Sequence, residues 1–272
     1  MNTIDLFCGA GGFSVGFELA GFETTLALDK WDQAIETFNY NRENKVAKSM
    51  DIYDYSNEML KSLKKQHEIT GIIGGPPCQG YSMVGTRDAK DARNSLYLQY
   101  VRFVEQIMPK FFILENVKGL LTLKDGFFKQ DIIERFGELG YNVNFKVLRA
   151  SEFGVPQNRE RVFFVGLRKD LFGDKFFEFP KPDKEHIVTT EMAICDMPSL
   201  DAGENPIRYR CEPVNEFQKL MRGDCTTITN NDVTVHTEQT IAIISKVPDG
   251  KSIKMFLMNF IRLEITTLHL RE

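Results

Sequence analysis

The sequence lacks the marks of several protein classes. It has no apolar run near the ~18–20 residues that cross a membrane. Its first residues, Met1–Asp5, lack the basic and then apolar pattern of a signal peptide. None of its five cysteines forms a Cys-x-x-Cys pair, which argues against a structural zinc site or a disulfide framework. We therefore expect a cytoplasmic protein with no membrane span and no metal site.

A basic excess is also missing. The 272 residues include 34 Lys and Arg against 38 Asp and Glu, for a net charge of −4. Bulk charge thus gives no sign of nucleic-acid binding, and any such binding must rest on local patches. With 42% apolar and 26% charged residues, the composition is typical of a globular protein, and the chain is long enough to bury a core.

Strand-like and helix-like stretches alternate in the first half of the chain. The pattern predicts strands over 3–7, 24–28, 71–75, 111–114, 141–148 and 161–167, and helices over 13–20, 34–41, 96–108 and 132–139. Strands that alternate with helices indicate an α/β fold with a mainly parallel sheet and helices on both faces.

The alternation weakens near Pro180 and Pro182, which predict a linker. From 183 to 254 the chain is polar and rich in turn residues, and from 255 to 272 it is apolar with few charges. We therefore expect a large domain over 1–182, a smaller region over 183–254 and a distinct tail over 255–272.

A glycine-rich turn follows the first predicted strand. Gly9, Gly11 and Gly12 separate that strand from the first helix, and Asp29 closes the next strand. Glycines at this point let a ligand approach the backbone, and an acidic residue there suits ribose hydroxyls. Because no G-x-G-x-x-G or G-K-[ST] pattern occurs, an adenosine ligand without a pyrophosphate is favoured. The alternative is a turn whose glycines serve packing alone.

A cysteine follows the predicted strand over 71–75. Cys78 comes directly after Pro76 and Pro77, with glycines on either side of the motif. In doubly wound sheets the carboxyl ends of the strands are where ligands bind. We therefore expect Cys78 to lie at a ligand site, with a structural cysteine as the alternative, whereas Cys8, inside the first turn, is typical of a packing residue.

A carboxylate and two arginines complete the candidate chemistry. Glu115 directly follows four apolar residues, where desolvation would raise its pKa and suit it to donate a proton near neutrality. The alternative is a buried helix N-cap at Glu115 or Asn116. Arg159 and Arg161, two residues apart on entry to a strand, point to the same side and could bind a carboxylate, a phosphate or a base oxygen. A solvated edge strand is the alternative for this pair.

Together these motifs resemble those of the C5-cytosine DNA methyltransferases of bacterial and phage restriction–modification systems. Residues 5–12 (DLFCGAGG) match the family's S-adenosylmethionine motif, and residues 76–79 (PPCQ) match its nucleophile motif. Residues 115–117 (ENV) match the acid motif, and residues 157–161 (QNRER) match the arginine motif. The resemblance implies a Rossmann-like, S-adenosylmethionine-dependent methyltransferase sheet over 1–182 and a partial target-recognition region over 183–254.

The resemblance also assigns roles to the candidate catalytic residues. The Cys78 thiolate would attack C6 of a cytosine flipped out of duplex DNA, so that C5 can accept the methyl group of S-adenosylmethionine. Glu115 would hold and protonate N3 of the base. Arg161 would support the carbonyl oxygen O2, with Arg159 nearby.

Cofactor and DNA contacts follow from the same resemblance. The residues expected at S-adenosylmethionine are Phe7, Gly9, Gly11, Asp29, Asp51 and Pro77. Asp29 would bind the ribose, in a position where the family commonly has Glu, and Asp51 would contact the adenine amine. The residues after the nucleophile resemble the family's catalytic loop, so DNA contacts are expected from Gln79, Ser82, Arg87 and Arg93. An ordinary exposed loop would have the same composition.

The match has gaps that leave alternatives open. Two C-terminal family motifs, an Arg-Leu-Gln-rich helix and a Gly-Asn-Ser-Val-Pro-Pro-type segment, do not occur. We expect a truncation or frameshift that ends in the tail 255–272, or a second chain that supplies the missing motifs. The chain would then be an inactive remnant or one subunit of a split enzyme that binds DNA or a partner. A tRNA cytosine-C5 methyltransferase is a further alternative. The absent pyrophosphate fingerprint disfavours a nicotinamide oxidoreductase.

Overall fold

The computed structural model divides the chain into two compact units, Met1–Ile187 and Val188–Glu272. The predicted boundary at 182/183 lies shortly before this division. The structure describes residues 1–77, 94–183, 185, 187–201, 203–228, 235, 237 and 238. Within this described part, no helix is both long and apolar enough to cross a membrane.

The first unit is built on a seven-stranded sheet of order β3-β2-β1-β4-β5-β7-β6. Five parallel strands come first in the sheet: β3 (Ala47–Ser49), β2 (Glu23–Asp29), β1 (Asn2–Leu6), β4 (Ile69–Gly74) and β5 (Phe111–Val117). The last two strands, β7 (Glu160–Arg168) and β6 (Tyr141–Arg149), run antiparallel to their neighbours. The predicted α/β sheet, mainly parallel, is therefore confirmed.

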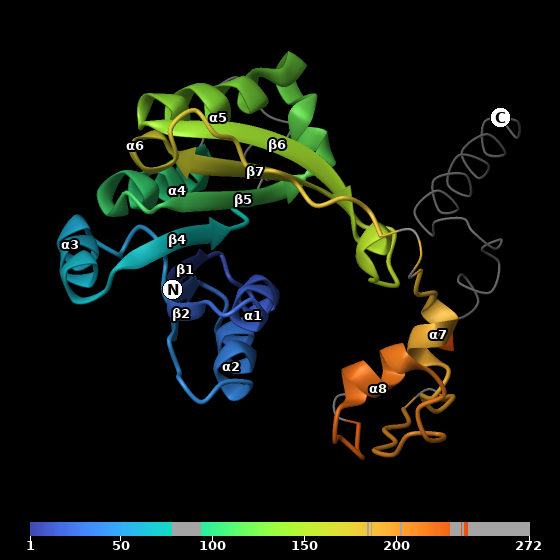
Figure 1. The fold of residues 1–272 in the computed structure, drawn as a ribbon. Helices are drawn as coiled ribbons and strands as arrows, with labels where there is room; N and C mark the ends of the chain where they lie inside the picture. Colours follow the sequence, from blue (N-terminus) through green and yellow to red (C-terminus); the bar gives the residue numbers. More distant parts are fainter. Residues whose placement is uncertain are drawn as a thin grey trace, which may run out of the picture. The chain divides into compact units, whose positions relative to one another are not determined.

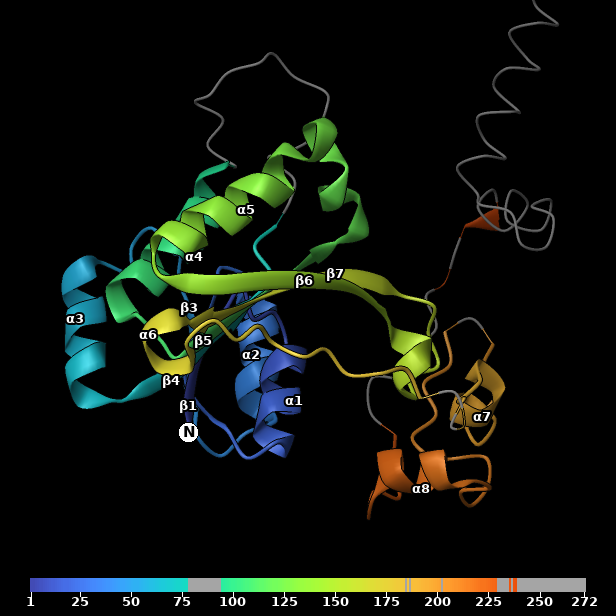
Figure 2. The same ribbon diagram turned by 45° about the horizontal axis from the view of Figure 1, so that its top comes forward.

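Helices cover both faces of the sheet, as Figures 1 and 2 show. The helices α1 (Gly12–Leu19) and α2 (Asp32–Tyr40) lie on one face, and α4 (Asn94–Ile107) and α5 (Phe127–Glu138) lie on the other. The described part of the unit also contains helix α3 (Asn57–Gln66) and the short α6 (Lys169–Phe172). The described residues also form the 3-10 turns η2 (Lys118–Leu121), η3 (Leu123–Gly126) and η4 (Ala150–Phe153).

The centre of the sheet is fixed by burial from both sides. All six residues of β4 are buried, as is usual for a central parallel strand. Tyr100 of α4 is fully buried, and its hydroxyl donates to the carbonyl oxygens of Ile72 and Ile113, at 3.1 and 2.9 Å. This side chain therefore joins α4 to β4, which precedes the predicted Cys78 motif, and to β5, which contains Glu115.

An apolar groove lies on the face of the sheet that carries α1. It has a volume of about 450 Å³. Its lining consists only of apolar residues and glycines: Gly12, Phe13, Gly16, Phe17, Ala20, Phe22, Phe111, Ile113, Val165, Leu167 and Phe177. We call this hollow the apolar groove.

The described part of the second unit is small and contains two short helices, α7 (Thr190–Ile194) and α8 (Glu216–Arg222). Each begins with a side-chain cap, from Thr189 and Asn215 respectively. Arg222 pairs with the buried Asp196 at 3.2 Å and stacks on the Tyr209 ring at 3.7 Å. These contacts link side chains at the centre of the described part of the unit, where Ile228 is the one buried apolar residue.

Candidate active site

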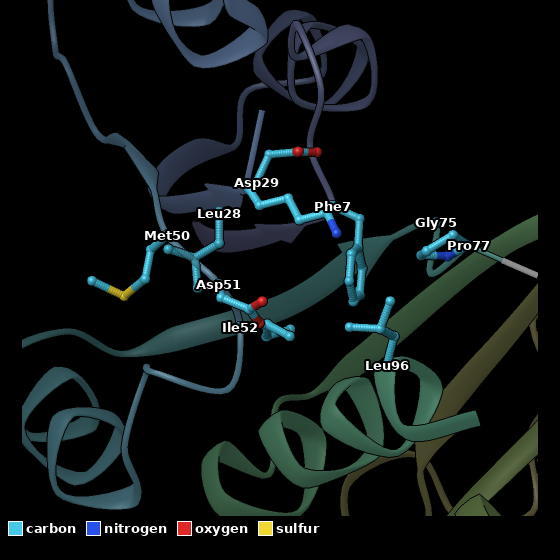
Figure 3. A pocket seen from close by; sticks show the side chains of 10 residues that line it. Phe7, Leu28, Asp29, Met50, Asp51, Ile52, Gly75, Pro77 and Leu96 are labelled. Atoms are coloured by element: carbon cyan, nitrogen blue, oxygen red, sulfur yellow. The ribbon is translucent and has the colours of Figure 1, made fainter. Parts of the chain in front are cut away.

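A second hollow, which we call the strand-end cavity, opens at the carboxyl ends of β1, β2 and β4. Its volume is about 440 Å³. The lining residues are Phe7, Leu28, Asp29, Lys30, Met50, Asp51, Ile52, Gly75, Pro77 and Leu96. Figure 3 shows Asp29 and Asp51 on one side of the cavity and Gly75 and Pro77 on the other, with Phe7 between them. In open α/β sheets this edge is the usual ligand site.

Four of the six predicted cofactor residues line this cavity, namely Phe7, Asp29, Asp51 and Pro77. Sequence reasoning found Phe7 and Pro77 but missed other apolar residues of the wall, among them Met50, Ile52 and Leu96. Met50 and Ile52 flank Asp51 and could have been found from it. Leu96 comes from α4, on the far side of the Cys78 motif, and no local signal connects it with the glycine turn.

The Asp29 carboxylate is fixed by two backbone amides. The N–H of Gly9 donates to Oδ2 at 2.9 Å, and the N–H of Trp31 donates to Oδ1 at 3.0 Å. These bonds hold the side chain beside the cavity (Figure 3). Gly9 itself is not among the lining residues, and in this structure it acts by orienting Asp29.

Gly11, also predicted at the cofactor, lies in a closely packed part of the turn. It is buried and outside the cavity lining, with a φ of 87°. A Cβ built at this position would lie 2.4 Å from the Phe38 ring of α2. Packing against α2, together with the positive φ, thus explains glycine at this position.

Phe7 connects β1 to the turn with a φ of 61°, which is uncommon for a residue with a side chain. Such a conformation costs on the order of 1–3 kcal/mol and persists only where the surroundings impose it. Its half-buried ring lines the cavity. The strained backbone therefore places an aromatic side chain in the wall.

Glu115 and Arg161 form an ion pair near this cavity. The Nε of Arg161 lies 2.8 Å from Oε1 of Glu115, and each side chain is about one quarter exposed (23% and 26%). Burial raises the pKa of Glu115, as expected, while Arg161 and Arg159 oppose the shift. The two predicted arginines thus act on one carboxylate, whereas the intervening Glu160 pairs with Lys118 and Arg149.

Residues at the end of β5 also contact the segment that follows β4, at Gly75 and Pro76. The side-chain amide of Asn116 donates to the carbonyl oxygen of Pro76 at 2.9 Å, and its Oδ1 accepts from the N–H of Val117 at 2.9 Å. A Cβ on Gly75 would lie 2.9 Å from Oε2 of Glu115. The Glu115 carboxylate therefore lies against the backbone three residues before Cys78.

The alternative of a helix cap at Glu115 or Asn116 is wrong. Both residues belong to β5, and the following η2 has Val117 as its N-cap residue, without a side-chain cap bond. The edge-strand alternative for the arginine pair is also wrong, because β7 lies between β5 and β6.

Several predicted residues lie outside the described residues: Cys78, Gln79, Ser82, Arg87 and Arg93. Cys8 is buried, and burial raises the pKa of its thiol, as fits a packing cysteine. Among the described residues, no group of three or more His, Cys, Asp or Glu side chains could hold a metal ion.

Comparison with known proteins places this geometry in a family. Residues 1–262 match the family described as C-5 cytosine-specific DNA methylase, and the match runs past residue 254, where we expected the tail to begin. The type II methyltransferase M.DdeI of Desulfomicrobium norvegicum is 40% identical over 261 residues, which cover 93% of this chain and 62% of that protein. M.FnuDI of Fusobacterium nucleatum is 47% identical over 188 residues, 68% of this chain and 52% of that protein.

A solved structure agrees with these relatives. The crystal structure of a protein described as a DNA modification methyltransferase encoded within a prophage (E. coli) has a TM-score of 0.75 and 27% identity. The alignment covers 93% of this chain and 77% of that one. The chain spans about half to three fifths of the length of the curated relatives named above. The chain belongs to the C-5 cytosine-specific DNA methylase family.

Proposed function

We propose that the protein transfers a methyl group from S-adenosylmethionine to C5 of cytosine in duplex DNA, as part of a restriction–modification system. The observation that carries the proposal is the Glu115–Arg161 pair against Gly75, on the approach to Cys78 and beside a cavity with two carboxylates. The relatives M.DdeI and M.FnuDI are named type II methyltransferases, which supports the same reaction.

The strand-end cavity fits S-adenosylmethionine in volume and chemistry. Its volume of about 440 Å³ lies within the roughly 300–1,000 Å³ usual for small-molecule sites. Asp29 would accept hydrogen bonds from the ribose, and Asp51 would accept one from the adenine amine. Phe7, Ile52 and Leu96 supply apolar surface. Bound there, S-adenosylmethionine supplies a methyl group activated by its sulfonium sulfur.

The reaction needs a nucleophile because C5 of cytosine is itself a poor one. The Cys78 thiolate attacks C6 and forms an S–C6 bond, and the electron pair of the C5–C6 double bond is made available at C5. C5 then takes the methyl group, and the electron pair of the broken bond to sulfur leaves with S-adenosylhomocysteine. A base removes the proton from C5, the C5–C6 double bond re-forms, and the Cys78 thiolate departs.

Glu115 supports this addition by donating a proton to N3 of the base, and it takes that proton back from N3 when the Cys78 thiolate departs. A carboxyl group whose pKa is raised by burial keeps its proton closer to neutral pH, so it can act as an acid. Arg161 holds the carboxyl in place through its Nε and would also face O2 of the base. Arg159 adds positive charge nearby.

The target atom is inaccessible within a stacked duplex. The cytosine must therefore be flipped out, at a cost of a few kcal/mol. Gln79, Ser82, Arg87 and Arg93 are proposed to contact the DNA, and the second unit is proposed to contribute to sequence recognition. The proposed activity belongs to the whole protein, together with any chain that completes it.

The test is methyl transfer from labelled S-adenosylmethionine to unmethylated genomic DNA, with nucleoside mass spectrometry of the product. We expect 5-methylcytosine in DNA and none in tRNA offered in parallel. Cys78→Ser should abolish transfer but retain cofactor binding, and Cys195→Ser, at an exposed cysteine of the second unit, is the matched control. Undiminished transfer by Cys78→Ser would remove Cys78 from the mechanism. Label in tRNA alone would overturn the DNA assignment.

A further inference from the structure

One wall of the strand-end cavity is a loop rather than a strand. Met50, Asp51 and Ile52 lie between the end of β3 and the start of α3. Two backbone bonds order the beginning of this loop: the N–H of Met50 donates to the Asp29 carbonyl oxygen at 2.9 Å, and the N–H of Asp54 donates to that of Asp51 at 2.9 Å. The carbonyl oxygens of Ile52 and Tyr55 need donors from elsewhere.

Those donors come from a single side chain on α4. Nη2 of Arg102 donates to the carbonyl oxygen of Ile52 at 3.1 Å and to that of Tyr55 at 2.9 Å. Nη1 donates to Oδ1 of Asn57, the first residue of α3, at 2.8 Å. Nε donates to Oε1 of Gln99, one turn earlier on α4, at 2.7 Å. Arg102 is therefore fixed on its own helix and holds both ends of the loop segment 52–57.

The contacts use the geometry of a guanidinium rather than its charge alone. The acceptors on the loop are two neutral backbone carbonyls and one amide oxygen, so no ion pair is involved. A planar fork with five N–H groups can reach all of them at once, whereas a lysine ammonium is a single point. Packing reinforces the same contact, because the Tyr55 and Phe103 rings lie 5.5 Å apart.

We propose that Arg102 is a positioning residue for the cofactor cavity: it fixes the Asp51–Ile52 wall and thereby sets recognition of the adenine end of the cofactor. Arg102 is not itself among the lining residues, so it acts through the loop. The inference rests on the proposed function for the identity of the ligand. The order that Arg102 gives to the loop depends on no ligand.

The experiment compares Arg102→Lys and Arg102→Gln with the unchanged chain. Arg168→Gln is the matched control, because Arg168 also donates to a backbone carbonyl, that of Met108, and to a carboxylate, that of Asp170, and it lies outside the cavity lining. The first measurement is amide hydrogen exchange without ligand. We expect faster exchange over residues 51–57 in both Arg102 variants and none of that change in Arg168→Gln.

The second measurement is the Kd of S-adenosylmethionine, of S-adenosylhomocysteine and of the analogue whose adenine amino group is replaced by oxygen. If the Arg102 variants lose the ordered Asp51–Ile52 wall, the Kd of the two compounds that contain adenine should rise by about tenfold, the equivalent of one hydrogen bond. Binding of the analogue, which has a carbonyl oxygen where adenine has its amino group and so lacks the N–H donor at that position, should change little. The preference for adenine therefore shrinks, and kcat at saturating cofactor stays the same. A merely structural role would weaken all three ligands alike.

The outcomes separate the two proposals. Unchanged exchange over 51–57 in Arg102→Gln, or equal weakening of all three ligands, overturns the role of Arg102. Full recovery by Arg102→Lys also overturns it, because charge alone would then suffice. Failure of the unchanged chain to bind S-adenosylmethionine overturns the proposed function, and the exchange measurement still decides whether Arg102 orders the loop.

Discussion

Two hollows in the first unit have almost the same volume and opposite chemistry. The strand-end cavity and the apolar groove measure about 440 and 450 Å³. The first combines apolar side chains with Asp29, Asp51 and Lys30, whereas the second has no polar side chain in its lining. Volume alone therefore does not distinguish a candidate ligand site from an apolar hollow here. A few polar groups that converge on a rigid sheet edge are the usual mark of a ligand site.

The position of the two hollows on the sheet explains the contrast. Parallel strands deliver their carboxyl ends, and the polar residues that follow them, to one edge, and there Asp29, Asp51 and Pro77 meet. The apolar groove lies instead over the first residues of β5 and the last residues of β7, where alternate side chains of each strand line it (Phe111 and Ile113, Val165 and Leu167). Its lining is apolar because it consists mainly of side chains on a packed face of the sheet and on the helix beside it.

The largest effect expected at the polar edge comes from Glu115→Gln. Gln keeps the size of the side chain but cannot donate the proton, so kcat should fall by roughly 10²- to 10⁴-fold. Single-turnover methyl transfer measures the loss, and a Kd for S-adenosylmethionine unchanged from that of the parent chain shows that the fold is intact. A loss of only a few fold would mean that another group supplies the proton.

A smaller effect, on cofactor affinity rather than on kcat, is expected from Asp29→Ala at the same edge. The carboxylate is proposed to accept from the ribose, and hydrogen bonds to a charged group contribute roughly 1.5–3 kcal/mol. The Kd for S-adenosylmethionine should therefore rise by roughly 10- to 100-fold in a calorimetric titration. Equal affinity in variant and parent would place the ribose elsewhere.

Asp5 provides a third case to compare with the two hollows, because it is a buried carboxylate that lines neither of them. Its Oδ2 accepts from the Ser14 hydroxyl at 2.6 Å, while Oδ1 has no partner in the described structure. Burial raises the pKa of Asp5 from 3.8 to about 7, so the folded state binds this proton more tightly than the unfolded state. The free energy of unfolding should fall as the pH rises from 3.8 through about 7.

Asp5→Asn removes the carboxyl group that titrates. In this variant the free energy of unfolding should change less with pH between 3.8 and about 7. Denaturant unfolding at a series of pH values, with the parent chain alongside, measures the slope. If the free energy of unfolding has the same slope against pH in both proteins, Asp5 is already ionised in the folded state throughout this pH range, and the prediction is wrong.

The smallest effect on cofactor affinity is expected from a substitution in the apolar groove. Phe177→Ala enlarges it and keeps the backbone carbonyl that accepts from Asn144 at 2.8 Å. Because distant sites are nearly additive, the Kd for S-adenosylmethionine should change by less than about twofold. A larger change in the same titration would show that the two hollows are coupled.

The sequence predicts the polar edge better than the rest of the sheet, for physical reasons. The strand over 3–7 and the carboxylate at Asp29 follow from local alternation of apolar and polar residues. Glu115 follows from a charge placed directly after a buried run. The direction of β7 does not follow, because side chains alternate with a period of two in parallel and antiparallel strands alike.

Other features depend on contacts between distant residues. Gly11 faces Phe38 of the next helix, and a glycine pattern alone does not separate packing from ligand approach. Helix α3 was missed because its sequence is polar, with Leu60 its one buried residue. Arg102 donates to the carbonyl oxygen of Ile52, fifty positions away, and Leu96 lines the same cavity as Ile52. Nothing in the local pattern of α4 points to either role.

The wall of the strand-end cavity is assembled from segments that extend from Phe7 to Leu96. These segments separate when the unit unfolds, so a ligand bound there can stabilise only the folded chain. By linkage, a ligand at one hundred times its Kd adds about 2.7 kcal/mol to the free energy of unfolding. The melting temperature of the unit then rises with ligand concentration, so thermal denaturation reports which nucleoside the cavity accepts before any DNA is offered.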